Sequence, residues 1–240
     1  MKKIKNSSEL LWVFGMIFVA LGVSICGKAN LGVSMIAAPA FVISEALLSV
    51  SPFFSVGVTE YLFQGVILIV LCIVLRKFNW RFLLAFIVAV LYGYVLNFFL
   101  WVFGGINFDA VWLRWVMLIV GDVFTAFGVA CFFHTYMPLQ VYELFVAEVS
   151  NGFKLKIGKV KWVFDISLLV ISLVLAITLF GDVSSFNWVS ITYSSFHSIG
   201  LGTLVTTAIN SPLISFMSGV ITKTFEPTPL LPKLEKILKI

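Results

Sequence analysis

Charged side chains are scarce in this sequence. Asp, Glu, Lys and Arg make up only 11% of its 240 residues, whereas a soluble domain carries about 25%. Hydrophobic residues make up 61% of the chain, and the mean hydropathy is +1.10. Because such a chain cannot cover a water-facing surface with polar groups, a soluble globular fold is excluded and the lipid bilayer is the expected solvent.

Cysteine and histidine are also scarce, with three and two copies. Cys26, Cys72 and Cys131 lie inside apolar runs and show neither a disulfide framework nor the spacing of metal ligands. His134 and His197 stand alone and far apart. The sequence contains no phosphate-binding loop, dinucleotide-binding loop, zinc-protease motif or nucleophile elbow. It therefore predicts no enzyme, no metal site and no cofactor.

The apolar residues fall into runs that can cross a membrane, since a helix needs about 20 residues to span a hydrocarbon core about 30 Å thick. Two further stretches are ambiguous, because 31–50 contains Pro39 and Glu45 and 137–152 is too short. We predict an all-α polytopic membrane protein with about six transmembrane helices plus two re-entrant or half-helix segments, and eight spanning helices is the alternative. The six predicted spans lie at 9–27, 57–75, 82–103, 114–134, 162–180 and 195–218.

The basic residues predict an orientation. The net charge of +5 does not indicate nucleic-acid binding, because Lys and Arg cluster beside the spans, where they set membrane topology. With six spans and the N-terminus inside, only Lys28 and Arg114 are external, whereas eight spans would move the 76–81 cluster outside and weaken the bias. We therefore expect cytoplasmic N- and C-termini. The predicted cytoplasmic residues are Lys2, Lys3, Lys5, Arg76, Lys77, Arg81, Lys154, Lys156, Lys159, Lys161, Lys223, Lys233, Lys236 and Lys239.

An apolar segment occurs twice. Residues 12–25, WVFGMIFVALGVSI, return in altered form as residues 118–131, LIVGDVFTAFGVAC, so that Gly15 recurs as Gly121 and Gly22 as Gly128. Further along the sequence, residues 55–70 align with residues 156–171. With three spans in each half, the second half would enter the membrane upside down, as in inverted-repeat transporters.

The repeat divides the chain into three regions. We predict a first membrane repeat at 1–108, a second at 109–222, and a cytoplasmic tail at 223–240. The tail contains three prolines, followed by alternating Leu, Ile and Lys. This pattern is typical of a short helix in the headgroup layer, and a frayed polar tail is the alternative.

Polar groups within the apolar runs are candidates for a substrate- or ion-binding site, because an ionisable group in a span is costly and usually faces the bundle interior. Some of these groups occupy equivalent places in the two halves, and the pair at 60 and 64 shares a helix face, as does the pair at 161 and 165. The candidates are Glu60, Gln64, Asp122, Glu143, Lys161, Asp165, Asn97 and Asn210.

Each candidate also has a simpler interpretation. Glu60 and Lys161 could lie at helix mouths in headgroup water, which would leave only Asp165 in need of an internal partner. Asp122 could make a structural hydrogen bond to a neighbouring helix, for example to an asparagine side chain. Glu143 could lie on an amphipathic surface helix with its carboxylate in water.

Two glycine-rich motifs resemble those of the YczE/YyaS/YitT group of bacterial membrane proteins. ANLGVSMIAAPAFVIS (29–44) is similar to the first-half loop of the group, and GLGTLVTTAINSPLI (200–214) is similar to its last-span signature. The sequence departs from the group at Ile36–Ala37, where an aromatic–acidic pair is usual, and at Met137–Pro138, which replaces Leu-Gly. The resemblance implies a multipass protein of the bacterial cytoplasmic membrane, and it implies no particular reaction.

From these observations we expect a small-solute transporter with a polar site between two repeats. One alternative is a substrate-binding subunit of a larger transporter, since 240 residues make a small transporter. Another is a non-transporting membrane accessory factor with a dry, closed interior. The expected partners are the lipid bilayer, an unidentified small solute, and a partner subunit or further copies of the chain.

Overall fold

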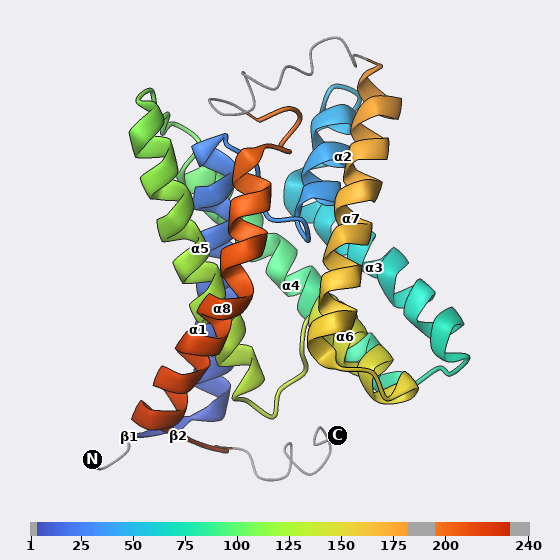
Figure 1. The fold of residues 1–240 in the computed structure, drawn as a ribbon, viewed down its shortest axis with the longest axis vertical. Coiled ribbons are helices and arrows are strands. Elements are labelled where there is room, and N and C mark those ends of the chain that lie inside the picture. The colour runs from blue at the N-terminus through green and yellow to red at the C-terminus, as the bar shows by residue number, and fades with distance from the viewer. Residues whose placement is uncertain (1–3, 182–194, 231–240) are drawn as a thin grey trace.

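The part of the chain that the computed structural model describes, residues 4–181 and 195–230, folds into eight helices and one pair of short strands. Figure 1 shows the helices as a bundle whose long members run between its two ends. The helices are α1 (Ser8–Ala29), α2 (Ala38–Leu48), α3 (Val56–Leu75), α4 (Trp80–Val102), α5 (Val111–Phe133), α6 (Val141–Phe153), α7 (Ile157–Phe180) and α8 (Leu201–Thr224).

Six of these helices are long and apolar enough to cross a membrane, namely α1, α3, α4, α5, α7 and α8. With 20–24 residues each, they measure about 30–36 Å, which matches the hydrocarbon thickness. Helices α2 and α6 have 11 and 13 residues and reach only about 16–20 Å. The prediction of six long apolar helices and two short ones is confirmed, and the chain is a multipass membrane protein.

Some predicted boundaries are wrong by several residues. Helix α7 begins at Ile157 instead of 162, because Lys159 and Lys161 are accommodated in its first turns. The last span was expected at 195–218 and is found at 201–224. Residues 195–200 instead form a loop held to the end of α1, with the Ser195 amide donating to the Asn30 carbonyl oxygen at 2.8 Å.

Helices α1 and α5 pack against each other along their glycines. A Cβ added to Gly128 would lie 2.6 Å from the Gly15 carbonyl oxygen, and one added to Gly121 would lie 2.7 Å from that of Gly22. The pairing of the first glycine of α1 with the last of α5 shows that the helices are antiparallel. Small residues at such a contact let two backbones approach closely in lipid.

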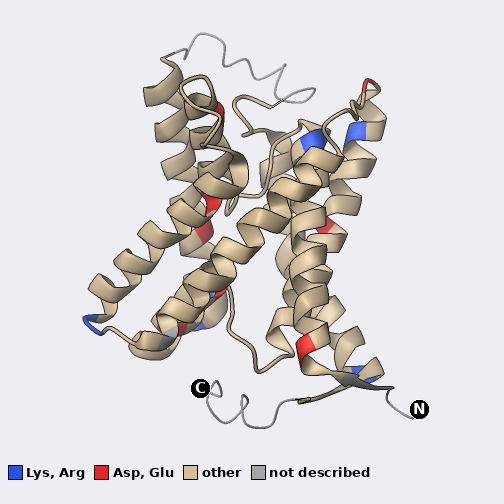
Figure 2. Cartoon of the chain, turned by 180° about the vertical axis from the view of Figure 1, so that it is seen from behind, with Lys and Arg blue, Asp and Glu red and all other residues tan. Residues whose placement is uncertain are grey.

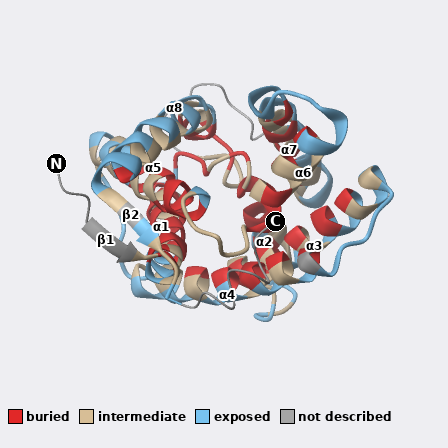
Figure 3. Cartoon of the chain, turned by 90° about the horizontal axis from the view of Figure 1, so that it is seen from below, coloured by how far each residue is buried: buried red, intermediate tan, exposed pale blue. Residues whose placement is uncertain are grey.

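The remaining helices pack around this central pair. Helix α4 packs on α1 and α3, and α8 packs on α5. Helices α2 and α6 each contact both α3 and α7. Viewed from below, α1, α5 and α8 gather on one side and α2, α3, α6 and α7 on the other, as Figure 3 shows. The short helices α2 and α6 lie toward opposite ends of the bundle (Figure 1).

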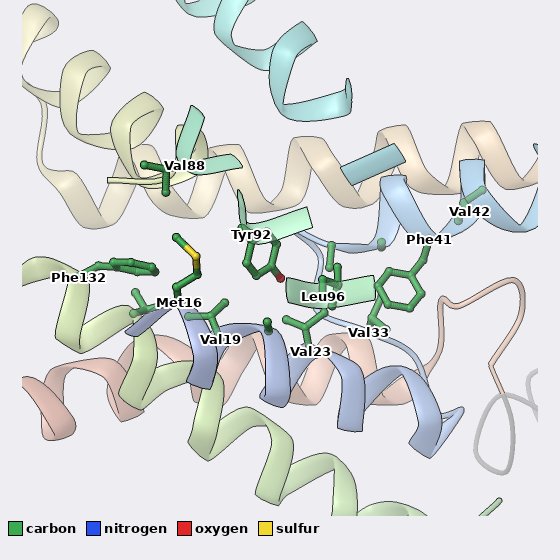
Figure 4. Packing of buried hydrophobic residues seen from close by; sticks show 14 of the residues in the cluster. Met16, Val19, Val23, Val33, Phe41, Val42, Val88, Tyr92, Leu96 and Phe132 are labelled. Atoms are coloured by element: carbon green, nitrogen blue, oxygen red, sulfur yellow. The ribbon is translucent and has the colours of Figure 1, made fainter. Parts of the chain in front are cut away.

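An apolar core joins α1 to α4 and to the segment that leads into α2. Met16, Val19 and Val23 on one face of α1 meet Tyr92 and Leu96 of α4, as Figure 4 shows. Many other large apolar side chains are exposed, for example Ile69 at 63% and Ile73 at 68%. Exposed apolar surface of this kind is what a bilayer covers.

The two ends of the described chain lie together. Strand β1 (Ile4–Ser7) pairs in parallel with strand β2 (Phe225–Thr228), which follows α8 directly. The loop between α3 and α4 and the helix α6 lie at the same end of the bundle (Figure 1). Figure 2 shows most of the basic residues near the ends of the bundle, while acidic residues also occur at mid-height.

Of the predicted tail, residues 225–228 form a strand. The helix expected in the headgroup layer, with Lys233, Lys236 and Lys239, lies outside the described residues.

Replacing Gly128 with valine is expected to lower the free energy of unfolding by about 1–3 kcal/mol, because the side chain would press on the α1 backbone. Unfolding of the purified protein by titration with sodium dodecyl sulfate measures this. Gly219→Ala is the control, since a Cβ there would meet nothing within 4 Å. An equal loss of stability in both variants would contradict a close α1–α5 contact.

Candidate functional site

A cavity of about 330 Å³ lies within the bundle and collects five of the eight predicted side chains. Its walls come from α1, α5, α6, α7 and α8, together with the segment before α2 and single residues of α3 and α4. The predicted residues that line it are Glu60, Glu143, Lys161, Asp165 and Asn210.

Glu60 lies near the start of α3 and is only 2% exposed. The simpler interpretation, in which Glu60 lies in headgroup water, is therefore wrong. Burial results from α2 and α6, which pack against this helix. Gln64, one turn later, donates from Nε2 to Glu60 Oε1 at 3.3 Å. The other oxygen of Glu60 is buried and has no hydrogen-bond partner in the described part of the chain.

Lys161 and Asp165 form an ion pair on α7, with 3.1 Å between Nζ and Oδ2. The lysine side chain is 26% exposed and the aspartate side chain 8%. Asp165 therefore points into the bundle, and Lys161 lies nearer the opening. This is the pairing that the spacing of four residues predicts, and it neutralises one carboxylate of the cavity.

Glu143 lies in the first turn of α6, just after the N-cap residue Gln140. A carboxylate is favourable there because the N-terminus of a helix carries partial positive charge. Nevertheless, Glu143 Oε2 and Gln140 Nε2 are both buried without a hydrogen-bond partner among the described residues. Burial raises the pKa of Glu143 to about 7, although its backbone hydrogen bond and the charge of Lys161 oppose the rise. The interpretation of Glu143 as a carboxylate in water is therefore wrong.

Asp122 is held by Asn210, which donates from Nδ2 to Oδ1 at 2.8 Å. Asp122 is 4% exposed and borders a separate void of only about 10 Å³. Its carboxylate therefore lies behind the main cavity, and Asn210 connects the two. The structural hydrogen bond weighed for Asp122 from the sequence is present, with an asparagine on α8 as its donor.

Asn97 does not reach the cavity. Its side chain accepts from the Gly57 amide and donates to the Ser55 hydroxyl, both at 2.8 Å. Asn97 thus joins the end of α4 to the start of α3. Gln64 does not line the cavity either, and contributes only through its bond to Glu60.

Two buried tyrosines of the cavity wall are absent from the predicted set. Tyr92 on α4 is 2% exposed and Tyr142 on α6 is 3% exposed. The sequence offered one indication of these two residues, namely a tyrosine hydroxyl inside an apolar run. That indication is weak, because tyrosine is also common at membrane interfaces. Within the described residues, no group of three or more His, Cys, Asp or Glu side chains could hold a metal ion.

The cavity is therefore apolar over most of its wall, with a cluster of carboxyl groups, one ammonium group and several uncharged donors and acceptors. This combination is typical of a site for a small molecule. A second cavity of about 580 Å³ lies near the start of α4 and the segment between α5 and α6, and it contains none of the eight predicted side chains.

Residues 6–219 match a family of unknown function, DUF6198. No curated protein and no solved structure matches the chain.

Replacing Asp122 and Asn210 with leucine, singly and together, is expected to reveal a coupling free energy of about 0.6–1.7 kcal/mol. The double variant should lose less stability than the two single losses combined, because no buried polar group is left alone. Unfolding by titration with sodium dodecyl sulfate gives the four stabilities. Asn97→Leu is the control, since Asn97 bonds elsewhere, and it should show no coupling to Asp122→Leu. Additive losses for Asp122 and Asn210 would contradict the interaction.

Proposed function

The chain belongs to the DUF6198 family of unknown function, and we propose that it transports a small solute through the cavity between its two halves. The observation that carries this proposal is the cavity itself. Polar side chains from α3 in the first half and from α6, α7 and α8 in the second half converge on it, and Glu60 of α3, Tyr142 of α6 and Asp165 of α7 are buried. Such convergence near the middle of a bundle, between two repeats, is the arrangement of sites in many secondary transporters.

The packing of the helices supports an inverted repeat. If α1 corresponds to α5, α2 to α6, α3 to α7 and α4 to α8, a two-fold axis turns several helix contacts into other contacts of the same fold, whereas the contact between α3 and α4 has no strong counterpart between α7 and α8. The pair α2–α7 becomes α6–α3, and α1–α4 becomes α5–α8, and all four pairs are in contact. The glycine contacts Gly15–Gly128 and Gly22–Gly121 exchange in the same way.

The two halves differ where this symmetry would place the exits. At the start of α3, Gly57 packs directly on Gly93 of α4, and Asn97 closes the contact with a hydrogen bond. At the corresponding start of α7, Gly158 lines the cavity, and a Cβ there would meet nothing within 4 Å. One exit is thus packed shut, and the other is open.

A transporter that works by alternating access has one exit closed while the other is open, and this asymmetry between the two exits fits that requirement. The open exit lies at the end of the bundle that holds the paired strands and α6 (Figure 1). If the basic residues mark the cytoplasmic side, the chain is in an inward-open state. In the outward-open state, α7 and α8 would close around Gly158 and the contact between Gly57 and Gly93 would open.

The proposal also covers the orientation of the protein in the membrane and the membrane in which it lies. The basic clusters at 76–81 and 154–161 support cytoplasmic termini. The resemblance to the YczE/YyaS/YitT group supports a bacterial cytoplasmic membrane. The cytoplasmic location of the termini and the bacterial cytoplasmic membrane both stay predictions. A substrate-binding subunit would use the same cavity, whereas an accessory factor would need no second conformation, and this difference can be tested.

A pair of cysteines at Gly158 and Ile214 is expected to form a disulfide under mild oxidation, because both residues line the cavity and closure would bring α7 and α8 together. The native Cys26, Cys72 and Cys131 are first replaced with alanine. Gel mobility of the protein in its native membrane reports the cross-link. The single variant Gly158→Cys should react with an impermeant maleimide only from the side that carries the termini.

The matched control pairs Ser167→Cys with Ile214→Cys, since Ser167 is exposed on the same helix and does not line the cavity. This pair should stay reduced. If the pair at Gly158 and Ile214 also stays reduced, the proposed closure is wrong and a rigid accessory factor becomes the better explanation. Labelling of Gly158→Cys only from the opposite side would overturn the orientation.

A further inference from the structure

The cavity has an excess of negative groups. Its lining contains three carboxyl side chains and one lysine in the described part of the chain. Lys161 forms an ion pair with Asp165 at 3.1 Å, and no second Lys or Arg lines the cavity in the described part of the chain, so three carboxyl groups share one ammonium group. The carboxyl groups of Glu60 and Glu143 come from different helices, α3 and α6, and line the same cavity.

The unused hydrogen-bonding atoms of the cavity point to a ligand. Glu60 is 2% exposed and Gln140 is 4% exposed, and each has a buried polar atom with no partner among the described residues, namely Oε2 and Nε2. Glu143 Oε2 is in the same state. The Tyr142 hydroxyl, which also lines the cavity, is a fourth such group and can donate or accept. Buried polar atoms are nearly always paired in folded proteins, so these four groups at one cavity indicate a missing partner, and the two carboxyl oxygens require that this partner donate.

The rest of the wall is apolar. Phe164 is 7% exposed and Tyr142 3%, and their rings lie 6.2 Å apart on facing helices. The face of an aromatic ring attracts a cation as well as an apolar group. Other apolar residues of the wall include Val19, Val23, Met35, Val129, Val146 and Ile214.

We propose that the cavity binds an organic ammonium ion with a compact apolar body, and that its charged nitrogen lies between Glu60 and Glu143. This inference rests on the proposed function and names its substrate class. The N–H groups of the ligand supply donors to the two free carboxyl oxygens, and the apolar body covers the valines and Phe164. An anion would be repelled by the carboxyl groups, and an uncharged ligand could not take the place of the proton that they share.

Binding of the cation displaces a proton. Two carboxyl groups that line one cavity of low dielectric do not both stay ionised, so we expect the empty cavity to hold a proton shared between Glu60 and Glu143. When the ammonium ion enters, one proton leaves, and the net charge of the site is unchanged. The other titratable groups that face the pair are Tyr92 of α4, Tyr142 of α6, and the ion pair on α7.

The test uses the full chain in lipid nanodiscs and three probes of similar size, phenethylamine, 2-phenylethanol and 3-phenylpropanoate. We expect phenethylamine alone to bind, as measured by titration calorimetry. Glu60→Gln and Glu143→Gln should each weaken its binding by about tenfold or more, because each removes a charge-assisted hydrogen bond. Glu148→Gln is the matched control, since Glu148 lies on α6 but does not line this cavity, and its affinity should equal that of the unaltered chain.

Proton release gives an independent reading. Titration at about pH 6 in two buffers of different ionisation enthalpy should show the release of about one proton per phenethylamine bound, and this release should disappear when both glutamates are replaced with glutamine. A purely structural role of the glutamates would not produce this signal. Unchanged elution volume and unfolding midpoint show that the glutamine variants are folded.

The inference is overturned if no probe binds, if 2-phenylethanol or 3-phenylpropanoate binds as tightly as phenethylamine, or if the two glutamine variants bind like the control. Each of these results leaves the proposed transport function intact, because that function is judged by the disulfide between α7 and α8, which needs no ligand. Failure of that disulfide with binding of phenethylamine would instead show a cation-binding protein that does not alternate.

Discussion

The contact between α1 and α5 determines how the two halves of the chain meet. In lipid, apolar surface alone gives no reason for one helix to prefer another, so association depends on close packing and on hydrogen bonds between helices. The four glycines of this interface bring the backbones together at two levels, and Phe18 and Phe124 pack between them with ring centroids 5.6 Å apart. The other long helices are then arranged around a fixed antiparallel pair.

A central cavity follows from the short helices. Helices α2 and α6 reach only part of the way through a bilayer, and each is packed between α3 and α7. Their polar ends therefore need shelter from hydrocarbon. The carboxyl groups of Glu60, Glu143 and Asp165 share this shelter, since an ionisable group facing lipid is costly. The polar site and the broken spans are thus two aspects of one constraint.

The sequence predicted the long helices well, because their positions depend on the length of apolar runs. It predicted α8 less well, since hydroxylated residues lower the apparent hydrophobicity of that helix. In the structure, Thr206, Ser215 and Thr222 donate to backbone carbonyl oxygens within the helix, so they cost little in a span. The pair Lys161–Asp165 was predictable because its spacing is local. The burial of Glu143 was not, because it depends on the packing of α6 against α3, which lies far from it in the sequence.

In the proposed repeat, Asp122 of α5 corresponds to Met16 of α1, and this difference affects how the proposed cycle can run. Asp122 and Asn210 bind α5 to α8, whereas Met16 is an apolar member of the core between α1 and α4. Helix α8 is therefore tied more firmly to α5 than its counterpart α4 is to α1. In the proposed closure, α8 would move together with α5, and α7 would move with α2 and α6, which pack against it. Because the glycine contact keeps α1 and α5 close at two levels, a rocking motion about that contact needs less rearrangement than a sliding motion along it.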